Sequence, residues 1–150
     1  MEGIYEVTSP EETQKLGFEF GSKATPGTVI ALIGDLGVGK TVFTKGFAQG
    51  LGIKEDVVSP TFTILETYES GRLDLYHFDV YRIGDVEEME EVGFDDYVYG
   101  NGVSLIEWAG LIEDIMPKGT FVVNIKKDLS KGLDYRLIEI TKSEKEGSLS

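Results

Sequence analysis

A lysine and a threonine follow three closely spaced glycines in the first third of the chain. Residues 34–41 have the sequence GDLGVGKT, which fits the phosphate-binding pattern G-x-x-x-x-G-K-[ST]. The glycines remove Cβ atoms that would keep main-chain N–H groups away from a polyphosphate, and they permit positive φ. Lys40 can reach the β- and γ-phosphates, and the Thr41 hydroxyl can ligate Mg²⁺. The residues expected to bind nucleotide here are Gly34, Asp35, Leu36, Gly37, Val38, Gly39, Lys40 and Thr41.

Two acidic residues end apolar segments farther along the chain. Asp79 ends the segment 73–79, and Glu107 follows the segment 103–106. Ligands of open α/β sheets lie at the carboxyl ends of parallel strands, so both carboxylates would lie near the phosphates if both segments run parallel to residues 28–33. There they could bind Mg²⁺ directly or through water, or orient the attacking water. A charged residue that ends an apolar strand is also an ordinary solvated boundary, but nucleotide hydrolysis needs such an acid.

Three further features lie close to these acids. The segment 59–63, SPTFT, stands where nucleotide switches place a hydroxyl that senses Mg²⁺ and the γ-phosphate, although it could also be a loop before a strand. His77, the only histidine, alternates with Asp79 on one strand face, which favours a half-buried strand residue. Trp108 follows Glu107 and could either stack on a ligand or pack against the protein.

Residues 124–128 are the segment that comes nearest to a guanine-binding motif. Their sequence, NIKKD, differs from the guanine-binding N-K-x-D of GTPases, because the lysine is displaced and the spacing is one residue too long. Nothing else in the sequence clearly recognises guanine, so ATP and its product ADP are the predicted nucleotides.

The elements around these residues predict an α/β sandwich. Residues 28–33 form a short apolar run rich in β-branched residues, which is typical of a fully buried parallel strand. Ser9, Pro10 and Glu12 form a capping box that begins a helix reaching about residue 24. The other expected strands are 4–8, 62–69, 73–79, 103–106, 120–127 and 135–141. The other expected helices are 40–51, 85–91, 93–99 and 109–115.

This mixture of βα units and hairpins predicts a P-loop NTPase-like fold. We expect a mixed, mainly parallel sheet of six or seven strands, with helices on both faces and a C-terminal hairpin. The 150 residues suit one domain, 1–150, of which residues 143–150 are expected to be a frayed tail. With 41% hydrophobic residues and no cysteine, the chain is expected to be globular, without disulfides or a thiolate metal site. No apolar run reaches membrane-spanning length and the acidic N-terminus is no signal peptide, so a cytoplasmic protein is predicted.

The net charge of −13 limits the choice of partners. A chain this acidic should repel nucleic acid at long range, which argues against direct binding of RNA or DNA by this chain alone. The cations that a bound polyphosphate needs must therefore be local. The acidic run 85–91 is by default a solvated helix face, but it could also meet a basic protein partner.

Together these motifs resemble the bacterial TsaE family, also called YjeE. The resemblance rests on residues 34–41, 59–63, HFDVYR at 77–82 and SLIEW at 104–108, and it runs from about residue 9 to residue 125. It implies an ATPase needed for threonylcarbamoyl modification of adenosine in the tRNA anticodon loop. It also implies TsaD and TsaB proteins as partners, with tRNA reached only through them.

The resemblance implies roles for individual residues. Thr41 and Glu107 would be Mg²⁺ ligands, Asp79 a second acid near the metal, and Thr61 the hydroxyl of a switch segment. Phe62 stands where the family often has tyrosine, so no hydroxyl is available there. The C-terminal hairpin matches poorly. Candidate nucleotide contacts outside the loop are Ser9, at the first helix cap, and Lys131, in the last loop.

Three functions remain open from the sequence. The first is an ATPase, slow alone, that drives a partner complex through a cycle. The second is a small P-loop kinase, which usually carries an arginine-bearing lid. The chain has only three arginines, Arg72, Arg82 and Arg136, and no obvious lid. The third is a nucleotide-gated binding module with negligible hydrolysis.

Overall fold

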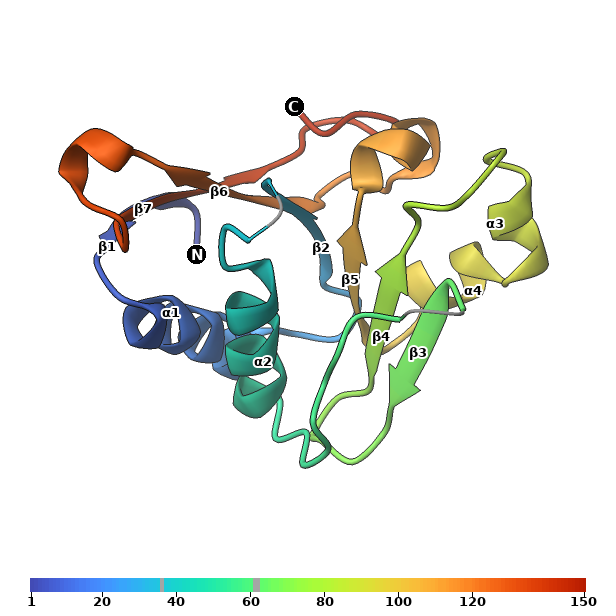
Figure 1. The fold of residues 1–150 in the computed structure, drawn as a ribbon. Coiled ribbons are helices and arrows are strands. Elements are labelled where there is room, and N and C mark those ends of the chain that lie inside the picture. Colours follow the sequence, from blue (N-terminus) through green and yellow to red (C-terminus); the bar gives the residue numbers. More distant parts are fainter. Residues whose placement is uncertain (36, 61–62) are drawn as a thin grey trace.

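A sheet of seven strands forms the centre of the computed structural model, which describes residues 1–35, 37–60 and 63–150 (Figure 1). The strand order is β1-β7-β6-β2-β5-β4-β3. Strands β6, β2, β5 and β4 are parallel to their neighbours in this central group, while β3, β7 and β1 pair antiparallel at the two sides. The strands are β1 (Gly3–Val7), β2 (Val29–Ile33), β3 (Leu65–Tyr68), β4 (Leu75–Asp79), β5 (Val103–Glu107), β6 (Phe121–Lys127) and β7 (Arg136–Lys142).

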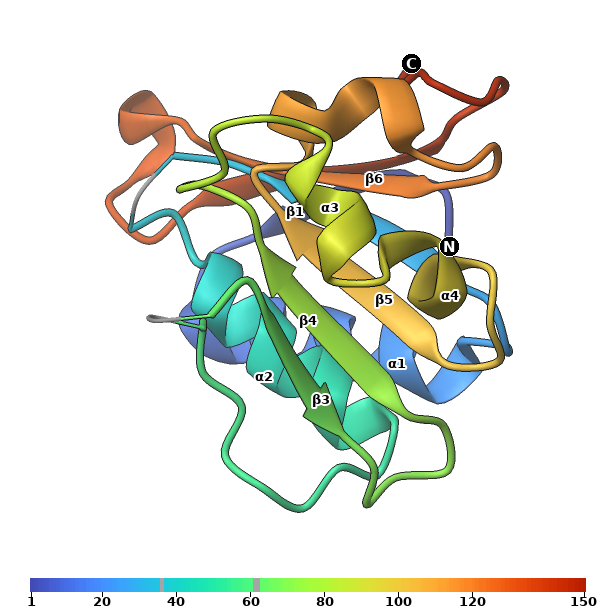
Figure 2. The same cartoon turned by 90° about the vertical axis from the view of Figure 1, so that its right-hand side faces the viewer.

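Helices cover both faces of this sheet (Figures 1 and 2). Helices α1 and α2 lie on one face, and the short helices α3 and α4 lie on the other. The mixed sheet with a mostly parallel centre, the two helical layers and the β6–β7 hairpin confirm the predicted fold class. The helices are α1 (Pro10–Lys23), α2 (Lys40–Gly50), α3 (Glu88–Glu91) and α4 (Phe94–Val98), with 3₁₀ segments η1 (Ala109–Ile115) and η2 (Leu129–Lys131). Within the described ranges, no helix is long and apolar enough to cross a membrane.

The central strand β2 shows why this sequence needs two helical layers. Successive strand side chains point to opposite faces of a sheet. Ile30 and Leu32 pack into the apolar cluster beneath α1 and α2, while Val29 and Ala31 pack into a second cluster with α3, α4 and η1. All four side chains are buried, as expected for a parallel strand covered on both faces.

Helices α1 and α2 touch through glycines. Gly17 and Gly21 of α1 face α2, and Gly46 and Gly50 of α2 face α1. A Cβ atom at Gly46 would clash with the carbonyl group of Gln14, and the other three positions are closed by backbone in the same way. The two helix backbones are therefore in direct contact at these four glycines.

The start of α1 follows the predicted capping box with one difference. The Ser9 hydroxyl accepts a hydrogen bond from the Glu12 N–H at 3.2 Å. The Glu12 carboxylate reaches one residue farther back than expected and accepts from the Thr8 N–H at 2.8 Å. Both contacts satisfy main-chain donors at the helix start.

Several predicted elements differ in length or type. Strand β3 begins at Leu65 rather than 62, and residues 61 and 62 lie outside the described part of the chain. Helix α3 is shorter than the predicted 85–91, a run with five acidic and no basic residues that can form no i,i+4 ion pair. The segment 109–115 is a 3₁₀ helix that is kinked at Ile112.

The last residues of the chain lie along η1. The Gly147 N–H donates to the Met116 carbonyl at 2.9 Å, and the Leu149 N–H donates to Oε2 of Glu113 at 2.9 Å. The segment expected to be a frayed tail, 143–150, therefore has specific contacts in this structure.

Candidate functional site

The glycine-rich loop joins the carboxyl end of β2 to the start of α2 (Figure 1). Gly37 and Gly39 have φ of 75° and 113°, a region that favours glycine. A Cβ atom at Gly34 would meet the side chain of Val38 and the carbonyl oxygen of Ile125. Each predicted glycine is thus required by the loop conformation or by its packing. Leu36, also predicted to bind nucleotide, lies outside the described residues.

An arginine that the sequence did not single out supports this loop. Arg136, the first residue of β7, donates from Nε to the Val38 carbonyl at 2.8 Å. Its Nη1 also donates to the carbonyls of Leu133 and Tyr135, at 2.8 and 2.7 Å. The guanidinium group therefore links the loop to the β6–β7 hairpin.

Lys40 begins α2, and its side chain is 9% exposed. Its Nζ atom lies 4.8 Å from the centre of the Trp108 ring, and the Trp108 ring in turn lies 4.8 Å from that of Tyr81. Trp108 has a φ of 64°, the only positive φ outside glycine in the described residues. This backbone turn directly after β5 places the indole ring beside the phosphate-loop lysine.

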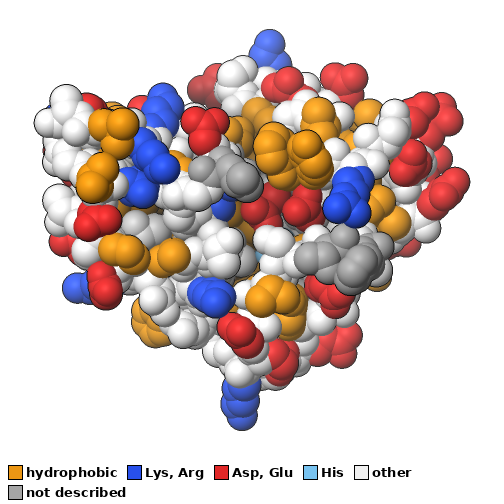
Figure 3. All heavy atoms as spheres, in the orientation of Figure 1, with side chains coloured by type: hydrophobic (Ala, Val, Ile, Leu, Met, Phe, Trp, Pro, Cys, Tyr) orange, Lys and Arg blue, Asp and Glu red, His pale blue; other side chains and the backbone are white. Residues whose placement is uncertain are grey.

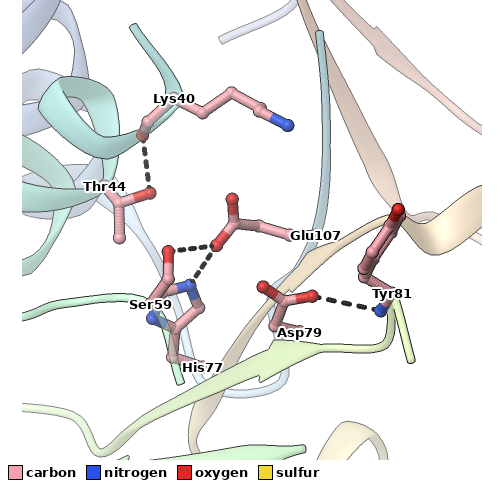
Figure 4. Close-up of polar contacts among 7 residues, drawn as sticks. All are labelled: Lys40, Thr44, Ser59, His77, Asp79, Tyr81 and Glu107. Atoms are coloured by element: carbon pink, nitrogen blue, oxygen red, sulfur yellow. Dashed lines mark hydrogen bonds and ion pairs between the residues drawn. The ribbon is translucent and has the colours of Figure 1, made fainter. Parts of the chain in front are cut away.

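The two predicted acids lie side by side at the same sheet edge as the loop. In the parallel β4–β5 pair, Asp79 is directly opposite Glu107. Both strands run in the same direction as β2, so the two residues lie at the sheet edge where β2 also has its carboxyl end. Figure 4 shows both carboxylates on the side of the sheet on which Lys40 lies. In the space-filling view, acidic side chains lie in a hollow near the centre of this face, bordered by hydrophobic side chains (Figure 3). Thr41, one residue into α2, is exposed.

Within the described residues, Glu107 takes part in two side-chain hydrogen bonds, and the sequence had not assigned His77 or Ser59 to it. Its Oε2 atom lies 2.8 Å from Nε2 of His77 and accepts from Oγ of Ser59 at 2.9 Å (Figure 4). His77 is 1% exposed, so the prediction of a half-buried strand residue was wrong. The sequence did contain a signal for such a contact. His77 shares a strand face with Asp79, and a buried imidazole needs a hydrogen-bond partner.

The surroundings of Glu107 favour its ionised form. Burial raises the pKa of this carboxyl group, but the hydrogen bond and electrostatic interaction with His77, the hydrogen bond from Ser59 and the charge of Lys40 together outweigh that effect. The net result is a pKa below the usual value, so Glu107 is a carboxylate at neutral pH. Asp79 has a different contact, because its Oδ1 accepts the Tyr81 N–H at 3.1 Å.

The available donors fit a magnesium ion that is shared with a nucleotide. In residues 1–35, 37–60 and 63–150, no three histidine or acidic side chains converge into a metal site. The candidates Thr41, Asp79 and Glu107 supply only oxygen atoms. Mg²⁺ prefers oxygen and is commonly held by one or two carboxylates together with phosphates and water, so this small donor set suits it.

Cavities lie on both sides of the loop. One of about 630 Å³ is lined by Gly34, Asp35, Lys40 and Trp108, among others. One of about 150 Å³ lies between the start of α1 and the loop, and its lining residues are Ser9, Pro10, Thr13, Gly37, Val38, Gly39, Val42, Asp134 and Arg136. Ser9 is thus brought to the loop.

Lys131 does not line either cavity beside the loop and stays a prediction as a nucleotide contact. The Lys131 Nζ atom lies 3.6 Å from Oε2 of Glu6 and over the Tyr135 ring, so its ammonium group is engaged at the far end of the hairpin. Thr61, the expected switch hydroxyl, lies outside the described residues. A cavity of about 310 Å³ beside that position is lined by Ser59, Pro60, Thr63, Ile64, Asp79, Tyr81 and Arg82.

Comparison with known proteins identifies the family. A family model described as threonylcarbamoyl adenosine biosynthesis protein TsaE matches residues 7–136. The chain belongs to the TsaE family. It is 49% identical over 137 residues to the tRNA threonylcarbamoyladenosine biosynthesis protein TsaE of Bacillus subtilis (strain 168), covering 91% of this chain and 84% of that protein. It is 42% identical over 118 residues to the TsaE protein of Treponema pallidum (strain Nichols), covering 79% and 87%.

A solved structure agrees with this assignment. The fold matches a crystal structure of Bacillus subtilis YdiB with a TM-score of 0.78 and 42% identity, covering 95% of this chain and 86% of that chain. The TsaE match begins two residues before Ser9 and ends at Arg136, so it extends beyond the residue 125 that the motifs alone suggested. It therefore includes every residue that lines the cavity between α1 and the loop.

Proposed function

We propose that this TsaE-family chain binds ATP with Mg²⁺ and hydrolyses it in support of threonylcarbamoyl modification of adenosine 37 in tRNA. One observation carries the proposal: the end of β2 and the start of α2 bring Lys40 and Thr41 to the same sheet edge as Asp79 and Glu107. A phosphate-binding loop beside two carboxylates at the ends of parallel strands is the arrangement that nucleotide hydrolysis requires. The names of the relatives supply the link to tRNA modification.

The loop is suited to bind the phosphates. Its glycines leave main-chain N–H groups accessible, and the first turn of α2 presents unpaired N–H groups and the positive end of the helix dipole. Lys40 adds a positive charge directly at the loop of a protein with a net charge of −13. We assign its ammonium group to the β- and γ-phosphates.

The acids are suited to the metal and the attacking water. The Thr41 hydroxyl and the Glu107 carboxylate are the proposed magnesium ligands, and Asp79 lies near enough to Glu107 to bind a metal-bound water or orient the attacking one. Held by Thr41 and Glu107, Mg²⁺ would supply positive charge against the charge that develops on the phosphate oxygens. Thr61 is proposed as the switch hydroxyl that responds to the γ-phosphate.

The cavity between α1 and the loop is the proposed place for the nucleoside. Ser9 and the first turn of α1 line one side, and Asp134 and Arg136 line another. Ser9 therefore remains a candidate contact, whereas the ammonium group of Lys131 is already paired with Glu6. ATP and ADP remain the proposed nucleotides.

A kinase is less well supported. Arg136 is committed to the Val38 carbonyl, and Nη2 of Arg72 donates to the Gly21 carbonyl at 2.6 Å. These two guanidinium groups serve the fold, so they are not available to clamp a transferred phosphate. We propose TsaD- and TsaB-like proteins in the cytoplasm as partners, with tRNA bound by them rather than by this chain.

The test is phosphate release from ATP by the isolated chain and by the chain mixed with TsaD and TsaB proteins. We expect slow release alone and faster release with the pair. Glu107→Ala should impair Mg²⁺-dependent release more than it impairs ADP binding, while an exposed control, Lys118→Ala, should change neither. Release that stays negligible with the pair would support a nucleotide-gated binding module instead. Salt-sensitive tRNA binding by the isolated chain would contradict the proposed role of the partners.

A further inference from the structure

A buried histidine at this site has no role in the proposed function. His77 lies on the interior strand β4, and its Nε2 atom is 2.8 Å from Oε2 of Glu107. We propose that His77 is a positioning residue that holds Oε2 of Glu107 and thereby presents the other oxygen, Oε1, to the metal. This inference rests on the proposed function, in which Glu107 is a magnesium ligand.

The register of β4 and β5 explains why Glu107 needs such a partner. Asp79 lies directly opposite Glu107, and like charges placed directly opposite each other on one sheet face repel. His77 lies opposite Leu105, so it is the diagonal neighbour of Glu107 on the same face, within reach of a long side chain. The bond from His77 gives the Glu107 carboxylate a donor on the neighbouring strand. The Asp79 carboxylate accepts from the Tyr81 N–H instead.

The hydrogen-bond roles at His77 follow from its surroundings. An ionised carboxylate only accepts hydrogen bonds, so Nε2 of His77 must carry the proton. Among the described residues, the buried Nδ1 atom has no hydrogen-bond partner. A proton on Nδ1 would therefore be a buried donor without an acceptor, which is costly. The structure therefore assigns a hydrogen atom to Nε2 of His77, the atom that donates to Glu107.

Both hydrogen bonds of Glu107 end on the same oxygen. Ser59 donates to Oε2 at 2.9 Å, so within the described part of the chain Oε1 is the oxygen left for another ligand. Figure 4 shows Oε1 directed away from His77 and Ser59, towards the side on which Lys40 lies. Ser59 belongs to the connection between α2 and β3, whereas His77 is fixed on a strand. The bond from His77 is therefore the one expected to persist when nucleotide binds.

The only histidine in the chain allows a direct test that does not depend on activity. In untagged, ¹⁵N-labelled protein, the imidazole nitrogens give a single set of NMR signals. We expect the Nε2–H tautomer, retained after MgCl₂ and ADP are added, and a shifted Nε2 signal in Glu107→Gln. An Nδ1–H tautomer, or an Nε2 signal indifferent to Glu107→Gln, would overturn the proposal.

Metal affinity provides the second test, with Mn²⁺ as the probe. Mn²⁺ binding in the presence of ADP is followed by electron paramagnetic resonance, and ADP binding in EDTA is measured separately. His77→Phe keeps a ring but loses the donor, and should weaken Mn²⁺ binding by about 10- to 100-fold while metal-free ADP affinity is unchanged. His77→Gln places an amide N–H near the Nε2 position and should recover most of the affinity. Ser104→Ala, which changes a buried side chain on the opposite face of β5, should have no effect.

The outcomes separate this inference from the proposed function. If Glu107→Gln leaves Mn²⁺ affinity unchanged, the metal role of Glu107 fails and the inference fails with it. If Glu107→Gln weakens Mn²⁺ binding but His77→Phe binds like Ser104→Ala, only the positioning role of His77 is refuted. Should His77→Phe fail to fold, the tautomer and the His77→Gln variant still decide the question.

Discussion

The ammonium group of Lys40 lies against the ring of Trp108, 4.8 Å from its centre. The cation proposed to bind phosphate therefore contacts the only tryptophan of the chain. A cation over an indole face is attracted by the ring quadrupole, with a free energy of about 0.5–1 kcal/mol at exposed sites. Because a bound polyphosphate attracts the same ammonium group far more strongly, nucleotide binding should weaken this contact.

Tryptophan fluorescence should therefore report nucleotide binding. We expect ADP or ATP to change the emission of Trp108, which is 39% exposed and responds to its surroundings. Lys40→Met keeps most of the aliphatic stem and removes the charge, so it should weaken nucleotide affinity by about tenfold or more, since hydrogen bonds to charged groups contribute about 1.5–3 kcal/mol. An unchanged emission spectrum of the wild type at saturating nucleotide would show that nucleotide binding does not alter the surroundings of Trp108.

Arg136 should matter for both stability and nucleotide affinity. Arg136→Met removes the donor to the Val38 carbonyl and should lower the free energy of unfolding by about 1–3 kcal/mol, as measured in urea. Arg136→Lys keeps the positive charge but lacks the planar fork, so it should not restore the loop. Full nucleotide affinity in Arg136→Lys would indicate that the charge, rather than the contact with Val38, is what matters.

The glycine contact between the first two helices should tolerate no side chain. Gly46→Ala places a methyl group against the Gln14 carbonyl and should lower the free energy of unfolding by about 1–3 kcal/mol, the usual effect of overpacking. For a chain of this size, each kcal/mol lowers Tm by about 2–4 °C. Gly110→Ala is the matched control, because a Cβ atom there meets no neighbouring atom. Equal melting temperatures for the two variants would contradict this account.

The pKa of Glu107 should make stability fall in acid. Hydrogen bonds lower this pKa below the ordinary carboxyl value, so the stability that the carboxylate contributes is present above that value and lost as the pH falls through the lowered one. Glu107→Gln removes that contribution. In urea unfolding from neutral pH to about pH 3, the wild type should therefore lose more free energy than Glu107→Gln. Parallel pH profiles would show that the pKa of Glu107 is not lowered by folding.

Local patterns were sufficient for most of the architecture. The apolar run 28–33, the glycines after it and the Ser9 cap each depend on neighbouring residues, and the structure has β2, the loop and α1 at those places. Strand ends were predicted within about three residues, as expected when boundaries depend on contacts with distant residues. The 3₁₀ character of the segment after Trp108 could not be predicted, because the segment begins after a positive φ at a non-glycine residue and is kinked at Ile112.

The contacts that complete the candidate site are long-range, and for that reason the sequence did not reveal them. Arg136 reaches a carbonyl 98 residues earlier in the chain, and Ser59 reaches Glu107 across 48 residues. No periodicity links such positions. The contact of His77 with Glu107 was easier to predict, because the strand face of His77 followed from the sequence. Its partner, however, depended on the register of β4 against β5.

The glycine contact between α1 and α2 has a consequence for the width of the cavity that is proposed to hold the nucleoside. Both helices begin at that cavity, α1 at Pro10 and α2 at Lys40, and farther along they touch backbone to backbone. At the glycines no side-chain rotamer can adjust to an added atom, so a larger residue there would have to move one helix relative to the other. The distance between the two helix starts accordingly depends on Gly17, Gly21, Gly46 and Gly50 rather than on the solvent-facing half of α1.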